Sequence, residues 1–185
     1  MFIKSFGAAF AALSLCLAPV SALEMTQQER SNHVGLLEAL EESGITIAVN
    51  KKEHCFRKDR EGILGAYAWW KKLLIICQEN SQDWNGEIVY FTDEDLDTIR
   101  HEAHHVVQDC LDGKINGKLH LYWTGKDREK MLRVLGEERV RKVESVYSSF
   151  DASKEEINLE LEAFTVAENI SAELISNAVR KQCNQ

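Results

Sequence analysis

The stretch RHEAHHVVQDC, residues 100–110, places three histidines and a glutamate within five positions. In a helix, His101 and His105 are four positions apart, so their rings lie one turn apart on the same face. Two imidazoles at this spacing can bind one Zn²⁺ at about 2.0–2.1 Å each. Glu102 is offset from that line, so it can act on a water beside the metal without binding the metal. The pattern is H-E-x-x-H, and it indicates a zinc-dependent hydrolase.

Glu102 is the predicted catalytic residue. Zinc lowers the pKa of a bound water to roughly 7, and Glu102 can accept the water's proton and pass it to the leaving amine. The alternative interpretation is a solvated helix face whose histidines bind nothing. The chain has six histidines and three of them crowd this segment, which favours the metal site. His104 is expected to be a bystander or a group that supports the ligands, because His101 and His105 already meet the geometry.

A catalytic zinc site needs a third protein ligand and one open position. The class that continues H-E-x-x-H-x-x-G-x-x-H is excluded, because Gln108 and Leu111 stand at those later positions. The stretch NLELEAFTVAEN, residues 158–169, offers a carboxylate from a later helix. On a helical projection Glu160 points into an apolar face, where a carboxylate is costly unless it is paired or bound to metal. Glu160 is therefore the predicted third ligand; Glu162, which the projection turns toward solvent, is the alternative.

Taken together, HEAHH and the downstream ELEA resemble the gluzincin branch of the zinc metallopeptidases. Many gluzincins take the third ligand from an E-x-x-A helix, which matches Glu160 to Ala163. The resemblance covers roughly residues 60–175 and implies a zincin-like α+β fold that hydrolyses peptide bonds. It also implies that a peptide or protein substrate binds in extended form along an antiparallel edge strand of the sheet. GAYAWW (65–70) or KLLIIC (72–77) would be that strand.

The sequence does not identify the residue that stabilises the oxyanion, and it leaves a second function possible. Enzymes of this branch often use a Tyr or His to stabilise the oxyanion, and His120, Tyr122 and Tyr147 are all candidates for that role. The rival function is a non-catalytic zinc-binding or scaffold protein of the cell envelope. A fourth protein ligand on the metal would favour this rival.

The N-terminus predicts export. A short positive start, Met1–Lys4, precedes an uncharged apolar run over 6–17 and the small residues VSA, which end at Ala22. This is the pattern of a cleaved signal peptide. The apolar run is shorter than the ~20 residues that span a membrane, so we expect no stable membrane insertion. Residues 1–22 are thus a predicted signal peptide, and 23–185 form a single zincin-like domain that is secreted or periplasmic.

Composition agrees with this interpretation. The chain has 185 residues, of which 44% are hydrophobic and 28% charged, as in a globular protein of one domain. Its net charge of -8 argues against nucleic acid as a partner. Removing the signal leaves four cysteines, and an even number in an exported chain predicts two disulfides. The favoured pairs are Cys55 with Cys77, at the two ends of a strand pair, and Cys110 with Cys183.

The expected order of elements is a helix, a β-rich region and a mainly helical second half. Capping residues and hydrophobic periodicity predict helices, and β-branched apolar runs predict strands. The expected strands are 44–49, 64–69, 73–77 and 87–91. The expected helices are 26–43, 93–112, 127–135, 137–149 and one long helix over 153–181.

Overall fold

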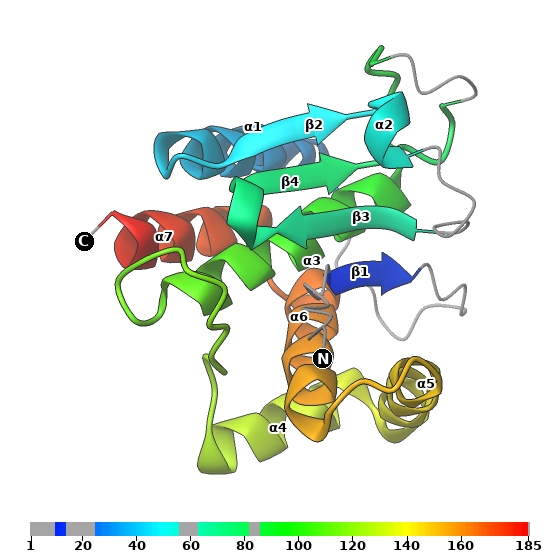
Figure 1. Cartoon of the computed structure of the whole chain (residues 1–185), viewed down its shortest axis with the longest axis vertical. Helices are drawn as coiled ribbons and strands as arrows, with labels where there is room; N and C mark the ends of the chain where they lie inside the picture. Colours follow the sequence, from blue (N-terminus) through cyan, green and yellow to red (C-terminus); the bar gives the residue numbers. More distant parts are fainter. Residues whose placement is uncertain (1–9, 14–24, 56–62, 82–85, 185) are drawn as a thin grey trace, which may run out of the picture.

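The computed structural model describes residues 10–13, 25–55, 63–81 and 86–184. Within them the fold is α+β and mostly helical, which confirms the α+β part of the predicted class (Figure 1). The strands are β1 (Phe10–Leu13), β2 (Thr46–Val49), β3 (Ile63–Ala68) and β4 (Leu73–Ile76). The helices are α1 (Gln27–Glu42), α2 (Lys52–Cys55), α3 (Asp93–Cys110), α4 (Gly125–Leu135), α5 (Glu137–Ser149), α6 (Lys154–Asn169) and α7 (Ala172–Cys183).

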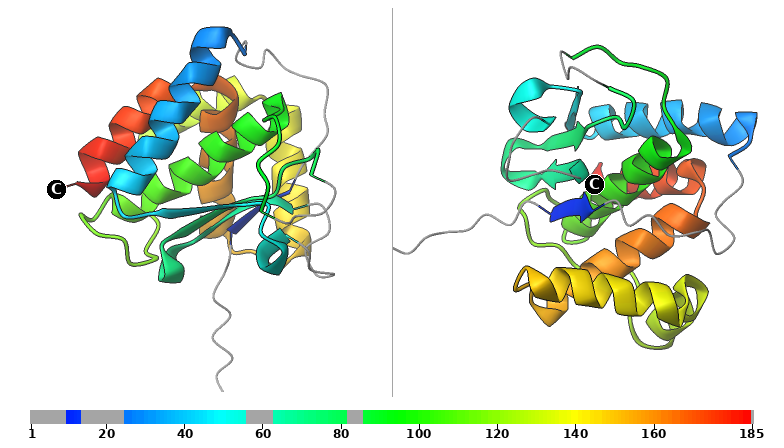
Figure 2. Two further views of the ribbon diagram at one scale, coloured as in Figure 1. Left: turned by 90° about the horizontal axis from the view of Figure 1, so that it is seen from above. Right: turned by 90° about the vertical axis from the view of Figure 1, so that its right-hand side faces the viewer.

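The sheet is small and mixed, with the strand order β1-β3-β4-β2. β3 and β4 form an antiparallel pair, β2 runs parallel to β4, and β1 is antiparallel to β3. The short 3₁₀ helix Trp69–Lys71 and the left-handed residue Lys72 make the turn between β3 and β4. Helices α1, α3 and α7 lie on one side of the sheet (Figure 2). The strands predicted over 44–49, 64–69 and 73–77 are confirmed as β2, β3 and β4.

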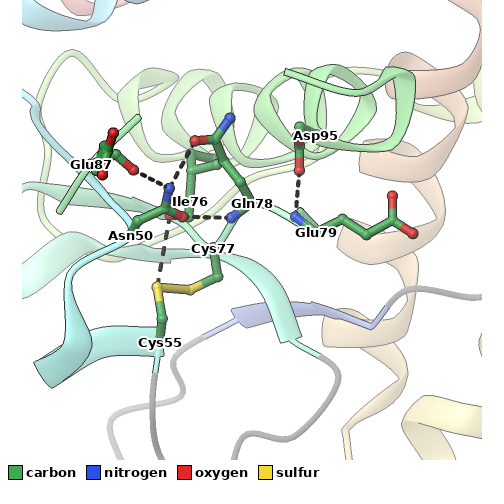
Figure 3. The surroundings of a disulfide bond; sticks show 8 residues. All are labelled: Asn50, Cys55, Ile76, Cys77, Gln78, Glu79, Glu87 and Asp95. Carbon is green, nitrogen blue, oxygen red and sulfur yellow. Dashed lines mark hydrogen bonds between the residues drawn. A yellow bond between two sulfur atoms is a disulfide. The ribbon is translucent and has the colours of Figure 1, made fainter. Parts of the chain in front are cut away.

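Helix α3 is the central element, because it packs against the sheet on one side and against α6 and α7 on others. Its start is fixed by a capping box in which Thr92 and Asp95 each bind the other's backbone N–H. Asp95 also accepts a hydrogen bond from the backbone of Glu79, which ties the end of the β-rich region to the helix (Figure 3). All faces of α3 are buried from Leu96 to Cys110 except at Asp97. The solvated-face alternative for the histidines is therefore wrong.

The long helix expected over 153–181 is in fact two helices, α6 and α7. Ile170 has an extended backbone with φ -116° and ψ 130°, and the Ser171 side chain caps the new helix at Leu174. Glu29 on α1 accepts a hydrogen bond from the backbone N–H of Ala172, so tertiary contacts stabilise the break. The break changes the helical phase. In one continuous helix Leu174 would lie on the same apolar side as Phe164 and Ala167, but after the break it is 58% exposed.

The segment 87–91 was expected to be a strand, and this prediction is wrong. The side-chain amide of Gln78 binds both the N–H and the C=O of Val89, and the Asn50 amide binds the C=O of Glu87. Asn50 and Gln78 are buried and also bind each other (Figure 3). Side-chain amides thus replace the backbone ladder of a strand. The alternation of residue types cannot distinguish these two ways of pairing an extended segment.

Both predicted disulfides are confirmed. Cys55 is bonded to Cys77, which directly follows β4 (Figure 3). Cys110 at the end of α3 is bonded to Cys183 at the end of α7. Their sequence separations are 22 and 73 residues. Disulfides persist in oxidising compartments, so the pair is consistent with an exported protein.

The longer disulfide should contribute more to stability. Cross-linking restricts the unfolded chain more when the closed loop is longer. We expect the double substitution Cys110→Ser/Cys183→Ser to lower the free energy of unfolding by about 4 kcal/mol, and about 1 kcal/mol more than Cys55→Ser/Cys77→Ser does. Urea unfolding of the two variants measures the difference. A larger loss from the Cys55–Cys77 pair would contradict this ranking.

The predicted signal peptide, residues 1–22, lies outside the described residues except for Phe10–Leu13, which form β1. Among the described residues, no helix has the length and apolar character needed to cross a membrane.

Candidate metal centre

His101 and His105 on α3 and Glu160 on α6 meet in the interior. Nε2 of His101 lies 3.2 Å from Nε2 of His105 and 3.2 Å from Oε2 of Glu160. Nε2 of His105 lies 3.4 Å from Oε1 of Glu160. Atoms that bind one zinc at 2.0–2.1 Å in tetrahedral geometry are about 3.3–3.4 Å apart. Each histidine thus faces a different oxygen of the Glu160 carboxylate. One donor atom from each of the three predicted ligands lies within 4.8 Å of the other two, which is close enough for the three residues to share one ion.

This group is buried, and its charges are coupled. Burial lowers the pKa of His101 to about 4. Burial also opposes a charge on His105, but the adjacent Glu160 carboxylate outweighs it and raises the pKa of His105 to about 9. Glu160 has a pKa of about 2 despite its own burial, because His105 and the hydrogen bonds from both histidines favour the charged form. Glu160 is thus ionised, as a metal ligand must be.

One oxygen of the group is weakly paired. Oε1 of Glu160 is buried, and the 3.4 Å approach of Nε2 of His105 is long for a hydrogen bond between charged groups. An ion would satisfy a buried carboxylate oxygen that is paired so weakly. No other set of three or more His, Cys, Asp or Glu side chains in the described ranges has donor atoms this close together. The residues present therefore fit a zinc ion.

Glu102 lies between the ligand group and strand β3. It is fully buried, and its charge is near enough to raise the pKa of both His105 and Tyr147. A Cβ atom on Gly65 of β3 would come 3.0 Å from Cγ of Glu102 and 2.5 Å from Cγ2 of Thr98. Only a residue without a side chain allows β3 to approach α3 this closely. The predicted base is thus beside both the ligands and the strand.

Of the three oxyanion candidates, Tyr147 is the one that lies at the ligand group. It comes from α5 and packs on Phe164. The ring centroid of Phe164 is in turn 4.4 Å from that of His101. Burial, the charge of Glu160 and a hydrogen bond with Glu160 raise the pKa of Tyr147 well above its usual range. Tyr122 instead lies against His104, and His120 is exposed. Helix packing, which the sequence pattern did not reveal, distinguishes the three.

Glu162 was expected to face solvent, and this prediction is wrong. Its carboxylate is fully buried and accepts hydrogen bonds from His104, Gln108 and the backbone N–H groups of Tyr122 and Trp123, at 2.8–3.0 Å. The segment that follows α3 folds back over this side of α6. A helical projection of α6 alone does not show that another segment covers Glu162. Although burial opposes its charge, the hydrogen bond from His104 lowers the pKa of Glu162.

The comparisons with known proteins give a family without an assigned activity. No curated protein and no solved structure matches the chain. One family model, described as a domain of unknown function (DUF8637), matches residues 22–184. This match spans most of the chain and includes His101, Glu102, His105 and Glu160. The chain therefore belongs to the DUF8637 family.

Proposed function

We propose that this protein is an exported, zinc-dependent peptidase of the zincin-like type. His101, His105 and Glu160 hold the zinc, and Glu102 is the general base. The observation that carries the proposal is the pair of histidine Nε2 atoms, 3.2 Å apart and each 3.2–3.4 Å from an oxygen of the Glu160 carboxylate, with the glutamate of the same H-E-x-x-H motif beside them. The two disulfides support export, with residues 1–22 removed as a signal peptide.

When bound, zinc supplies a Lewis acid that polarises the substrate carbonyl and acidifies water at the site. Glu102 accepts the proton that the attacking water loses as its oxygen bonds to the carbonyl carbon. Glu102 then gives this proton to the amide nitrogen as the C–N bond breaks. The second proton of the water stays on the new carboxyl group, and when this acid ionises it passes to the amine, leaving a carboxylate and an ammonium. Tyr147 is placed to donate a hydrogen bond to the oxyanion that forms between these two steps.

Strand β3 is the proposed substrate-binding edge, because Gly65 brings it against Glu102. An extended peptide that pairs with this strand would present its carbonyl groups beside the ligand group. Strand β1 pairs with this edge in antiparallel orientation, with Ala12 opposite Gly65. This pairing supports the proposal that the β3 edge can bind an extended chain.

Tyr147→Phe tests the oxyanion role. The substitution removes only the hydroxyl, so we expect kcat to fall by about 10²–10³-fold while zinc affinity stays close to that of the wild type. Tyr122→Phe is the matched control and should leave kcat unchanged. Steady-state kinetics on a cleaved peptide give kcat for both variants. An unchanged kcat in Tyr147→Phe would remove Tyr147 from the mechanism.

The alternative function is a non-catalytic zinc-binding or scaffold protein of the cell envelope. One observation favours it: Glu102 and the three ligands are all at most 2% exposed. A substrate must reach the site of a peptidase, whereas a structural zinc needs no access. In the full chain, however, the β3 edge pairs with β1, which belongs to the predicted signal peptide. The chain that begins at Leu23 is therefore the form to assay.

Zinc-loaded protein spanning 23–185, incubated with a broad peptide library, tests the proposed function. We expect cleavage products in mass spectra, loss of cleavage with a chelator, and recovery when zinc is restored. Stoichiometric zinc without any cleavage would instead support the non-catalytic alternative.

A further inference from the structure

The side-chain amide of Gln108 has only one orientation that its surroundings allow. Gln108 follows His105 by three residues on α3 and is fully buried. Its Nε2 lies 3.1 Å from the carbonyl oxygen of Leu159 and 3.0 Å from Oε1 of Glu162. Both partners are acceptors, and an amide nitrogen only donates. The amide oxygen must therefore face His105, where it lies 2.8 Å from Nδ1.

This orientation determines which nitrogen of His105 carries hydrogen. An amide oxygen only accepts, so Nδ1 of His105 must be the donor. The lone pair of the neutral ring is then on Nε2, the atom that faces His101 and Glu160. In the opposite tautomer, an N–H would point at the other two ligands. A metal can bind only the form that Gln108 selects.

Glu162 in turn holds Gln108 in place. The backbone N–H groups of Tyr122 and Trp123 and the ring of His104 all donate to its carboxylate. His104 is also stacked on Trp123, with ring centroids 6.1 Å apart. Nδ1 of His101 has no hydrogen-bond partner among the residues described. Of the two histidines, only His105 therefore has a hydrogen-bond partner, among the residues described, that fixes its tautomer.

We propose that Gln108 is a positioning residue: supported by Glu162, it holds His105 in the tautomer and orientation in which Nε2 binds the metal. The proposal rests on the zinc site of the proposed function. It also gives Glu162 and His104 a role at the site, although neither is a fixed position of the H-E-x-x-H motif or a predicted ligand. Groups that orient a ligating histidine typically change metal affinity by about 10–100-fold when they are removed.

The test compares Gln108→Met with Gln78→Met in the chain spanning 23–185. Gln78 is a matched control, because it is also a buried glutamine whose amide binds neighbouring groups, here Asn50 and Val89. Competition with a chromophoric chelator gives the zinc affinity of each variant. We expect Gln108→Met to bind zinc about 10–100-fold more weakly than wild type and Gln78→Met to bind it equally well. The visible spectrum of the cobalt-loaded protein should change only in Gln108→Met.

A reversed pair, Gln108→Glu with Glu162→Gln, provides the rescue. The introduced carboxylate can still accept the hydrogen on Nδ1 of His105, and the introduced amide can donate to that carboxylate, while the hydrogen bond to the carbonyl of Leu159 is lost. We expect this variant to bind zinc about tenfold more tightly than Gln108→Met. If Gln108→Met does not fold, Gln108→Asn takes its place, because its shorter side chain withdraws the amide from Nδ1 of His105: zinc binding about 10–100-fold weaker than wild type supports the role, and wild-type affinity overturns it.

The remaining outcomes separate this inference from the proposed function. Wild-type zinc affinity and an unchanged cobalt spectrum in Gln108→Met would overturn the positioning role and leave the zinc site standing. A wild-type chain that binds no zinc would overturn the zinc site and, with it, the role of Gln108.

Discussion

Glu102→Gln is expected to remove almost all peptide hydrolysis and to leave the zinc in place. Glutamine keeps the size of the side chain but cannot accept the proton of the attacking water. General base catalysis contributes about 10²–10⁴-fold, and kcat should fall by that factor. Zinc content should stay at the wild-type value, because the three donor atoms belong to other residues. Steady-state kinetics and elemental analysis of the same preparation measure both quantities.

A buried glutamate outside the site provides the control for this variant. Glu29 on α1 is buried and accepts the backbone N–H of Ala172, where α7 begins. Glu29→Gln should lower stability and leave kcat unchanged. If Glu102→Gln cleaves as fast as the wild type, the proposed mechanism is wrong even where zinc is bound.

The second large effect concerns the two glutamates of α6. Glu160→Gln should weaken zinc binding far more than Glu162→Gln. Glu160 lies 3.2–3.4 Å from both histidine Nε2 atoms, whereas Glu162 acts only through Gln108. Loss of a supporting group costs about 10–100-fold in affinity, and loss of the charged ligand should exceed that range.

Competition titration with a chromophoric chelator ranks the two variants. Each substitution removes one buried charge and keeps the side-chain size, so they are matched. Far-ultraviolet circular dichroism shows whether both remain folded. A greater loss of zinc affinity in Glu162→Gln would mean that α6 supplies a different ligand from the one assigned.

The parts of the site that the sequence predicted depend on local periodicity. The spacing of His101 and His105 follows from one helical turn, and Thr92 marks where that helix starts. The apolar stripe of α6 points Glu160 into the interior, where it meets the histidines. These features require only that each segment be a helix with one buried side. The role of these residues in metal binding stays a prediction.

The features that the sequence did not predict depend on contacts between distant segments. Glu162 is buried because residues after α3 cover it, and the break between α6 and α7 is stabilised by Glu29 of α1. The segment 87–91 is held by the amides of Asn50 and Gln78. In each case a side chain from one element forms a hydrogen bond with a backbone group of a segment far away in the sequence. A local pattern of residue types does not reveal such a contact.

A crystal structure of the zinc-loaded chain spanning 23–185, with data collected on both sides of the zinc absorption edge, tests the central claim most directly. We predict one anomalous peak between Nε2 of His101, Nε2 of His105 and the carboxylate of Glu160. No fourth protein side chain should bind the metal, because a peptidase needs one open position. The absence of a peak at these atoms would contradict the zinc site. A peak whose fourth ligand is a protein side chain would contradict the peptidase.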